Sequence, residues 1–443
     1  MLLVWAPIAW VIGMGALASG RGRWPLVAAA GTALAAALDV SRALAHPAWT
    51  DEYGALVLVL ATFALVMSPA YFRGAAVHHP WPAARERWYY AWLGVFAAAL
   101  LALAAPWPLV DLWVAVEATT LSSVLLVALP PGAGPFEASW KYVTLAMLGG
   151  LLALGGILLI QSGAAADVGV GALLMLVGFG TKAGLVPFHT WLPDAHAEAP
   201  APVSGLLSGA ELGGILIVAW RGLTLAQGVL HQHWPLLALL GLGLLSLVVG
   251  VALISRQHNL KRLLAYSSVE HMGVIAVGLA FGGPALLGAF LHVFTHGLAK
   301  SQAFYLSGSV QAHYGTVDTR QIHGLGRRLP WTAGGLMVAI GALAGLPPLG
   351  PFWSEWLVIQ GGLADKGMAV WAALTALLLA GGFVALMYRL PRLWQGSRPP
   401  VHPEGAGPQE SKLLSLPVLL MSSLTMSAGV VVPWVFLGLG RGV

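Results

Sequence analysis

The stretch GFGTKAGLVPFHTWLPDAHAEAPAPVSGLLSG, residues 178–209, places a lysine in an apolar run and follows it with a series of prolines. Lys182 lies where a lipid bilayer would surround it, and a charge at mid-membrane costs at least ~2.5–3.5 kcal/mol. The prolines forbid a continuous helix because they remove backbone donors and clash with the preceding turn: Pro187, Pro193, Pro200 and Pro202. A break at that depth is tolerated only where protein or a water-lined cavity surrounds it. The stretch therefore predicts a broken membrane helix that carries a functional lysine.

The composition of the whole chain supports a membrane location. Of the 443 residues, 58% are apolar and only 9% are charged, whereas a soluble domain carries roughly 25% charged residues. The absence of cysteine excludes Cys-ligated iron–sulfur clusters, thiolate zinc sites and dithiol redox pairs. The sequence pI is near 9.6, but the basic residues are scattered singly, so we expect a lipid bilayer and not nucleic acid as the partner.

Apolar runs long enough to cross a bilayer recur along the chain. A spanning helix needs roughly 20 mainly apolar residues, and the first run, at Leu2, has no basic segment before it, so we expect a helix there and not a signal peptide. The sequence predicts an all-α polytopic membrane protein with about 14 transmembrane helices, at 2–19, 24–45, 53–72, 87–105, 107–130, 137–161, 168–189, 202–223, 233–254, 262–282, 284–311, 330–360, 367–395 and 412–438.

Basic residues are divided unevenly between the two sides of the membrane. With this number of spans both termini lie on one side, and the loops of that side carry only four Lys or Arg residues, against fifteen on the other. The side richer in Lys and Arg faces the cytoplasm. We therefore expect a multi-pass protein of a bacterial inner membrane with both termini in the periplasm.

Several ionisable residues lie inside the predicted spans. Such residues are rare in membranes and usually mark ion pathways, proton relays or ligand sites. A lysine whose charge depends on a nearby glutamate can exchange a proton near neutral pH. Two other interpretations remain open: a lysine that snorkels to the headgroups, above all Lys141, and neutral carboxyls in helix contacts. The candidates for a proton pathway are Glu117, Lys182, His292, His296, Lys300 and Glu355, with Lys141, Glu211, Glu270 and His271 as further candidates.

Three of these residues, His292, His296 and Lys300, are each four positions apart. Four residues turn a helix by about 400°, so the three side chains form one stripe about 12 Å long. A stripe of titratable groups in an apolar helix is typical of a proton path. Two alternatives remain for His292 and His296: they could be a metal-binding pair, or they could simply pack in the core. Because the sequence shows no obvious third ligand, we expect no metal and no cofactor.

A second break, GLPPLGPF at 345–352, precedes Glu355. Paired Gly/Pro-interrupted segments in the two halves of a transporter indicate inverted repeats around a central ion pathway. The sequence thus suggests N-terminal helices at 1–84, a first repeat at 85–225, a second repeat at 226–395, and a cytoplasmic loop with the last helix at 396–443.

Four long motifs resemble the antiporter-like, proton-translocating membrane subunits of respiratory complex I, of membrane-bound hydrogenases and of multisubunit cation/proton antiporters. They are the opening stretch, KRLLAYSSVEHMG (261–273), HVFTHGLAKSQAFYLSGS (292–309) and GLPPLGPFWSEW (345–356). WVAVEATTLSS (113–123) and FEASWKY (136–142) favour the hydrogenase-4 component F type within this family. The resemblance covers roughly residues 85–395 and implies two inverted five-helix repeats, each with a broken helix.

The resemblance also implies roles for individual residues. Glu117 matches the glutamate of the family's fifth helix, and Lys182 matches the lysine of its broken seventh helix. Glu355 matches the terminal Lys-or-Glu of the broken twelfth helix, and the stripe from His292 to Lys300 matches the eleventh. Two features depart from the pattern. The span at 202–220 lacks the usual eighth-helix base and offers only Ser204, Ser208 and Glu211, and the chain ends soon after its last span, which suggests a subunit without the long lateral helix.

These observations favour a proton-translocating subunit of a larger energy-coupling complex. No nucleotide loop and no redox centre are recognised, so we expect no active site in this chain and look to partner subunits for the driving force: a hydrogenase or quinone-oxidoreductase module, or a carbon-capture protein that uses proton influx for inorganic carbon uptake. The alternatives are a sodium/proton antiporter module and a non-conducting scaffold that anchors a peripheral enzyme.

The polar cluster HTWLPDAHAEAP (189–200), within the first break, is predicted to form a proton entrance. A hydrogen-bonded lock for the loop, or a stand-alone catalytic or metal cluster, are the alternatives. Its ionisable members are His189, Asp194, His196 and Glu198.

Overall fold

The computed structural model describes residues 81–105, 107–388, 394 and 422–429. Regular structure within these residues is helical, and the extended backbone makes one isolated bridge, between Asn259 and Asp318. The expected spans at 2–19, 24–45 and 53–72, and most of the span at 412–438, lie outside the described residues. The first half of the described chain forms α4 (Ala83–Leu103), α5 (Leu109–Val127), α6 (Ala133–Ser162), α7 (Ala165–Lys182), α8 (Trp191–Glu198), α9 (Ala201–Leu206), the π-helix η1 (Leu207–Glu211) and α10 (Leu212–Leu230).

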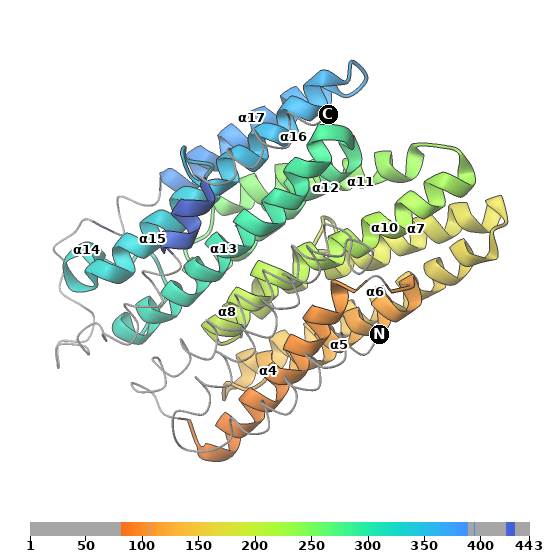
Figure 1. Ribbon diagram of the computed structural model, residues 1–443. Helices are drawn as coiled ribbons and strands as arrows, with labels where there is room; N and C mark the ends of the chain where they lie inside the picture. Colours follow the sequence, from red (N-terminus) through yellow and green to blue (C-terminus); the bar gives the residue numbers. More distant parts are fainter. Residues whose placement is uncertain (1–80, 106, 389–393, 395–421, 430–443) are drawn as a thin grey trace.

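The second half forms α11 (Trp234–Ile254), α12 (Leu260–Phe281), α13 (Gly283–Tyr314), α14 (Leu325–Arg328), α15 (Pro330–Leu343), α16 (Gly350–Ala364) and α17 (Ala369–Met387). Seven spans in the described chain are long and apolar enough to cross a membrane. The longest helix, α13, is not among them, because its stripe of histidines and a lysine lowers its mean hydropathy. The helices lie side by side with roughly parallel axes (Figure 1).

Both expected breaks are present. The predicted span at 168–189 ends as a helix at Lys182, and Gly184 in the left-handed region (φ 73°) begins the turn toward α8. The second break separates α15 from α16, and Gly345 takes the same kind of conformation there (φ 71°). The span expected at 202–223 is itself irregular, since it starts as α9, passes through η1 and continues as α10. The breaks therefore lie next to Lys182 and Glu355.

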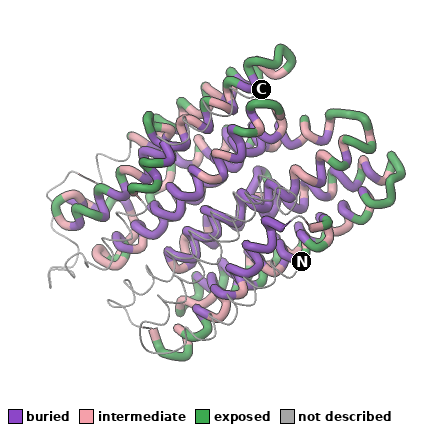
Figure 2. The backbone as a smooth tube through the Cα atoms, viewed as in Figure 1, coloured by how far each residue is buried: buried purple, intermediate pink, exposed green. Residues whose placement is uncertain are grey.

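Burial divides the bundle into a centre and a periphery. The segment from α9 to α10 is 94% buried and α12 is 89% buried over their most apolar windows, whereas α17 is only 22% buried. Figure 2 shows the buried residues gathered along the inner helices, with the exposed ones at the loops and outer faces. The exposed faces are apolar, as at Leu151, Leu158, Leu377 and Val384, which fits contact with lipid or with other membrane proteins.

Two helix hairpins, α6/α7 and α11/α12, are packed at backbone contact through glycines. A Cβ added to Gly149 would lie 2.9 Å from the carbonyl oxygen of Gly178, and one added to Gly171 would lie 2.6 Å from that of Gly156. In the second hairpin, a Cβ on Gly273 would lie 2.7 Å from the carbonyl oxygen of Gly243. Small residues let membrane helices approach this closely. One such hairpin lies in each half of the described chain.

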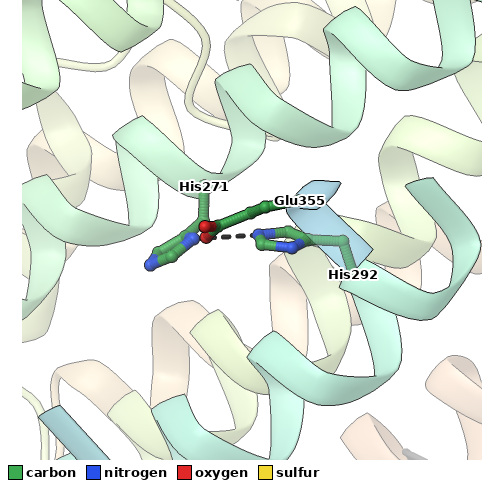
Figure 3. A group of neighbouring side chains, drawn as sticks. All are labelled: His271, His292 and Glu355. Carbon is green, nitrogen blue, oxygen red and sulfur yellow. Dashed lines mark hydrogen bonds between the residues drawn. The ribbon is translucent and has the colours of Figure 1, made fainter. Parts of the chain in front are cut away.

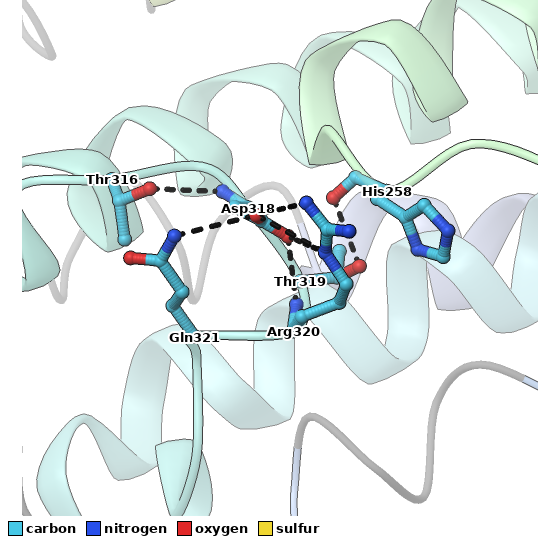
Figure 4. A network of polar contacts seen from close by, with 6 residues as sticks. All are labelled: His258, Thr316, Asp318, Thr319, Arg320 and Gln321. Atoms are coloured by element: carbon cyan, nitrogen blue, oxygen red, sulfur yellow. Dashed lines mark hydrogen bonds and ion pairs between the residues drawn. The ribbon is translucent and has the colours of Figure 1, made fainter.

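The loop after α13 is joined to the loop between α11 and α12. The Asp318 carboxylate accepts hydrogen bonds from the Arg320 guanidinium at 2.8–3.2 Å, and the Thr319 hydroxyl and amide both donate to the His258 carbonyl (Figure 4). The paired guanidinium lowers the pKa of Asp318 to about 2. The network thus ties together two connections that lie at the same end of the bundle.

Candidate functional site

A buried ion pair connects α5 to the end of α7. Lys182 Nζ lies 2.9 Å from Glu117 Oε1 and donates a hydrogen bond to Thr120 Oγ1 at 2.7 Å. Only 2% of Lys182 and 9% of Glu117 are exposed. The Glu117 carboxyl lies against Gly150 of α6, where a side chain would collide with it. Removing one partner of such a pair leaves an uncompensated buried charge, which costs about 3–5 kcal/mol.

A second carboxyl, Glu211, lies beside this pair at the end of η1. It is 1% exposed and interacts electrostatically with both Lys182 and Glu117, and Thr119 and Tyr142 are its hydrogen-bonding neighbours. π-Helical turns occur often at functional sites, where they redirect a side chain. The irregular turn therefore places Glu211 next to the Glu117–Lys182 pair, in the span that lacks the usual base.

Hydroxyl groups continue from η1 toward Lys300. Ser208 Oγ lies 2.6 Å from Ser268 Oγ, and since the Ser268 hydroxyl donates to the Leu264 carbonyl, Ser208 is the donor between them. Lys300 Nζ donates to the same carbonyl at 3.0 Å and to Ser267 Oγ at 2.8 Å. A continuous polar trail thus links η1, α12 and α13 through the span where the sequence offers no His or Lys.

Three histidines from two helices form the centre of the polar region. His271 of α12 lies between the two histidines of α13, with ring centroids 5.0 Å from His292 and 4.9 Å from His296, whereas those two are 6.1 Å apart. His271 Nδ1 and His292 Nε2 are 2.9 Å apart, and His292 Nδ1 lies 2.9 Å from Ser354 Oγ. The Glu355 carboxylate points to the same place (Figure 3). The histidines are at most 1% exposed and Glu355 is 9% exposed.

Several buried polar atoms in this region have no hydrogen-bond partner in the described protein. They include Glu117 Oε2, Glu211 Oε2, Glu270 Oε2, His271 Nε2 and His296 Nε2. Buried polar groups are nearly always satisfied, by protein or by ordered water. Their accumulation along one line therefore indicates that the region is suited to water.

Of the residues expected at the entrance, Asp194 lies at the edge of the bundle. Asp194 of α8 contacts Lys141 of α6 at 3.2 Å and Arg262 of α12 at 2.6 Å. Lys141 also pairs with Glu137 at 2.7 Å and its side chain is 44% exposed. We call the buried ionisable residues described above the buried line: Glu117, Lys182, Glu211, Glu270, His271, His292, His296, Lys300 and Glu355. Lys141 is therefore separate from the buried line, and Asp194 fastens the short α8 to two neighbouring helices.

The other members of the cluster point in different directions. The half-buried His189 lies edge-on to Tyr266 at a centroid distance of 6.3 Å, and the buried His196 stacks on Phe304 at 4.7 Å. Glu198 interacts electrostatically with Lys261, which the sequence assigns to a loop. In the structure Lys261 is 2% exposed in the first turn of α12, and its Nζ donates to the carbonyls of Ala197 and Ala199 at the end of α8.

The structure also identifies polar residues that the sequence analysis did not single out. Thr120, Ser267, Ser268 and Ser354 each contact one of the predicted residues. Spacing was an available signal for Thr120, which follows Glu117 by about one helical turn.

A model of the NADH:quinone oxidoreductase/Mrp antiporter transmembrane family matches residues 108–380, which include every residue of the buried line. The chain belongs to this family. As a member it is a helical, multi-pass transmembrane protein of the antiporter-like type, as the motifs led us to expect.

Relatives within the family are subunits of membrane complexes. The chain is 35% identical over 350 residues to the hydrogenase-4 component F homolog of Methylacidiphilum infernorum, which covers 73% of this chain and 71% of that protein. It is 32% identical over 332 residues to the NADH-quinone oxidoreductase subunit N of Xanthomonas euvesicatoria, covering 69% and 68%. Other relatives are longer: the chain covers only 30% of hydrogenase-4 component B of Escherichia coli.

The fold of the family is also found in a solved structure of the Mrp complex from Dietzia sp. DQ12-45-1b. One of its chains matches with a TM-score of 0.84 at 20% identity, covering 98% of this chain and 94% of that chain. This likeness concerns the fold.

Proposed function

We propose that this chain is a proton-conducting subunit of a larger energy-coupling membrane complex, in which protons move along the line from Glu117 to Glu355. The observation that carries the proposal is the buried ion pair between Glu117 and Lys182, 2.9 Å apart. Family membership supports the same function, because the family includes NADH:quinone oxidoreductase and Mrp antiporter subunits.

Separating the Glu117–Lys182 pair raises the free energy of the lysine ammonium, which then releases its proton. The ammonium of Lys182 is stable at 2% exposure only while the carboxylate of Glu117 compensates it. An uncompensated buried charge costs about 3–5 kcal/mol, whereas moving one charge against 100 mV takes about 2.3 kcal/mol. Displacement of Glu117, driven by a partner subunit, therefore raises the free energy of the protonated lysine by enough to expel its proton against a membrane potential on the order of 100–200 mV.

The proton released by Lys182 passes through the centre of the bundle to Glu355. Glu211 and the hydroxyls of Ser208 and Ser268 line the first part, with water between them. Lys300 and the three central histidines line the second part, and Glu355 is the terminal group beside the second break. The two segments bridge the gap that the missing eighth-helix base leaves in the sequence.

The division of the chain follows from the same proposal. We take 85–225 and 226–395 as two inverted repeats, each with one glycine-packed hairpin and one broken helix. We also propose that the chain lies in a bacterial inner membrane with both termini in the periplasm. Its partners are peripheral and membrane subunits of a hydrogenase, a quinone oxidoreductase or a carbon-capture system, and one of them supplies or uses the energy.

The conducted ion is a proton in preference to sodium. Sodium, like other hard cations, prefers clustered oxygen ligands. The buried line consists instead largely of nitrogen groups, from two lysines and three histidines, and imidazole nitrogen is a ligand for transition metals and not for sodium. A scaffold without conduction has no need for unpaired polar atoms along the line.

The test is the substitution Lys182→Met in the complex isolated from its native membrane and reconstituted into vesicles. We expect loss of proton uptake, followed with a pH-sensitive dye, while the complex still assembles. The matched control is Lys366→Met, in the exposed loop between α16 and α17, which should leave uptake unchanged. Full coupled uptake in Lys182→Met rejects the proposal, and sodium-dependent uptake favours the antiporter alternative.

A further inference from the structure

Three ligand-type side chains from three different helices converge at the centre of the bundle. They are His271 of α12, His292 of α13 and Glu355 of α16, and one ligand atom from each lies within 4.8 Å of the other two. Figure 3 shows the Glu355 carboxylate beside the facing nitrogens of the two rings. All three residues are buried, so the site has the composition of a protein zinc site, two imidazoles and one carboxylate.

We infer that His271, His292 and Glu355 form a binding site for a divalent transition-metal ion such as Zn²⁺, and that the bound ion blocks the proton path. The binding stands on the geometry of these residues alone. The block rests on the proposed function, because it requires that protons pass between the histidines and Glu355.

The distances fit a metal ion after small movements. Zinc binds imidazole nitrogen at about 2.0–2.1 Å in tetrahedral geometry, which places two such nitrogens roughly 3.3 Å apart. His271 Nδ1 and His292 Nε2 are 2.9 Å apart, so the rings need to separate by only about 0.4 Å. Rotation of its side chain brings in the carboxylate of Glu355, and water fills the fourth position, as in zinc sites with three protein ligands.

The hydrogen bonds around His292 leave its Nε2 with a free electron pair. Ser354 Oγ donates its hydrogen to the Pro351 carbonyl at 2.9 Å, so it accepts a hydrogen bond from His292 Nδ1. The proton of neutral His292 is then on Nδ1, and Nε2 faces His271 as an acceptor. A second hydrogen bond of this kind orients metal-binding histidines in proteins.

His271 can take the complementary form. Its Nδ1 faces His292, and its Nε2 has no hydrogen-bond partner in the described protein. When a metal ion replaces the hydrogen between the two rings, the proton of His271 moves to Nε2. No net proton loss from the histidines is needed, and both facing nitrogens become ligands.

The surrounding charges are close to balanced. Lys300 interacts electrostatically with all three central histidines and opposes a cation there. Glu270 interacts with Lys300 and with Glu355, and its carboxylate offsets the ammonium. The carboxylate of Glu355 then compensates part of the charge of the bound ion.

The first experiment measures binding without any transport assay. The full-length chain, purified in detergent with an affinity tag that contains no histidine, is titrated with Co²⁺, whose visible absorption reports tetrahedral nitrogen and oxygen ligands. We expect one tight Co²⁺ per chain, displaced by Zn²⁺. It should be lost in His271→Gln and in His292→Gln, and retained in the control His233→Gln, an exposed histidine at the start of α11.

A milder variant keeps the site testable even if the His→Gln variants do not fold. Ser354→Ala keeps all three ligands and removes the group that orients His292, so Co²⁺ affinity should fall by about 10- to 100-fold. Equal Co²⁺ affinity in the natural protein, His271→Gln and Ser354→Ala overturns the site. Loss of binding in His233→Gln alone assigns the metal to the surface and also overturns it.

The second experiment separates the site from the proposed function. Proton uptake by the reconstituted complex is measured against Zn²⁺ concentration, relative to the zinc-free rate of each variant. We expect inhibition, with the half-inhibiting concentration raised in Ser354→Ala by the same factor as its Co²⁺ affinity falls. If Co²⁺ binds but Zn²⁺ does not inhibit proton uptake, the proposed block of the proton path is rejected and the metal-binding site is retained. Uptake that survives Lys182→Met rejects the proposed function whatever the metal does.

Discussion

Gly150 of α6 offers a direct way to disturb the Glu117–Lys182 pair without changing either residue. A Cβ at position 150 would lie 2.7 Å from Glu117 Cδ, whereas carbon atoms in ordinary contact are about 3.5–4.0 Å apart. In Gly150→Ala the carboxyl must therefore move by about 1 Å. We expect this displacement to weaken the ion pair.

The size of the effect follows from the ion-pair distance. Lengthening the separation of Nζ and Oε1 from 2.9 Å by about 1 Å reduces the attraction by about 1.5 kcal/mol at an effective dielectric constant of roughly 20. That energy corresponds to about a tenfold change in an equilibrium. Proton uptake by the reconstituted complex should fall by about that factor in Gly150→Ala.

The matched control lies on the same helix. A Cβ at Gly155 meets nothing within 4 Å, so Gly155→Ala should keep full uptake. On a Glu117→Ala background, Gly150→Ala should have no further effect, because the group that it displaces is gone. Uptake in Gly150→Ala within twofold of that in Gly155→Ala would refute the reasoning.

Three further predictions concern other parts of the molecule. Ser268→Ala removes the acceptor of the Ser208 hydrogen bond, which is worth about 1 kcal/mol, and should slow proton uptake about fivefold. The control Thr144→Ala, on the exposed face of α6, should keep the natural rate, and equal rates in the two variants would contradict a role for the Ser208–Ser268 hydrogen bond. Arg320→Ala should return the pKa of Asp318 from about 2 toward 3.8. Because the natural carboxylate stays ionised until the pH falls through about 2, its stabilising contacts persist at pH 3 in the natural protein and are mostly lost in the variant. Faster amide hydrogen exchange of residues 316–321 at pH 3 in Arg320→Ala alone would verify this, and identical exchange would disprove it. Asp194→Asn weakens two partly exposed ion pairs, each worth about 0.2–1 kcal/mol, so thermal unfolding in detergent should shift by a few degrees at most relative to Asp365→Asn; global unfolding would show that Asp194 does more than fasten α8.

The sequence predicts the broken helices and most of the buried line because their charges and prolines are unusual in a membrane-spanning helix. Lys182 and Lys300 are charges in apolar runs, and the prolines after Lys182 interrupt a span, so both are visible without coordinates. Lys261 is a residue that the sequence alone assigns wrongly. It lies at the boundary of a run and reads as a loop residue, yet its amine caps the end of α8 inside the protein.

The hydroxyl trail and the metal-type cluster were not accessible from the sequence. Serine and threonine in membrane helices often bond only their own backbone, as Thr375 does to the Trp371 carbonyl. Ser268 looks no different until Ser208 is placed beside it. The cluster of His271, His292 and Glu355 draws one residue from each of three helices. Spacing along any one helix therefore shows only one of the three ligands, and their convergence depends on how α12, α13 and α16 pack.

The glycine-packed hairpins restrict how this molecule can change shape. Where carbonyl oxygens touch the backbone of the facing helix, as between Gly149 and Gly178 or Gly243 and Gly273, neither helix can slide or rotate without steric collision. Each pair of helices therefore moves as one rigid body. A rearrangement that parts Glu117 from Lys182 therefore has to move α5 against the α6/α7 pair, move the Glu117 side chain, or bend the proline-rich segment that follows Lys182. Labels placed across α5 and α7, or across that segment, would register such a movement, whereas labels within one hairpin would not.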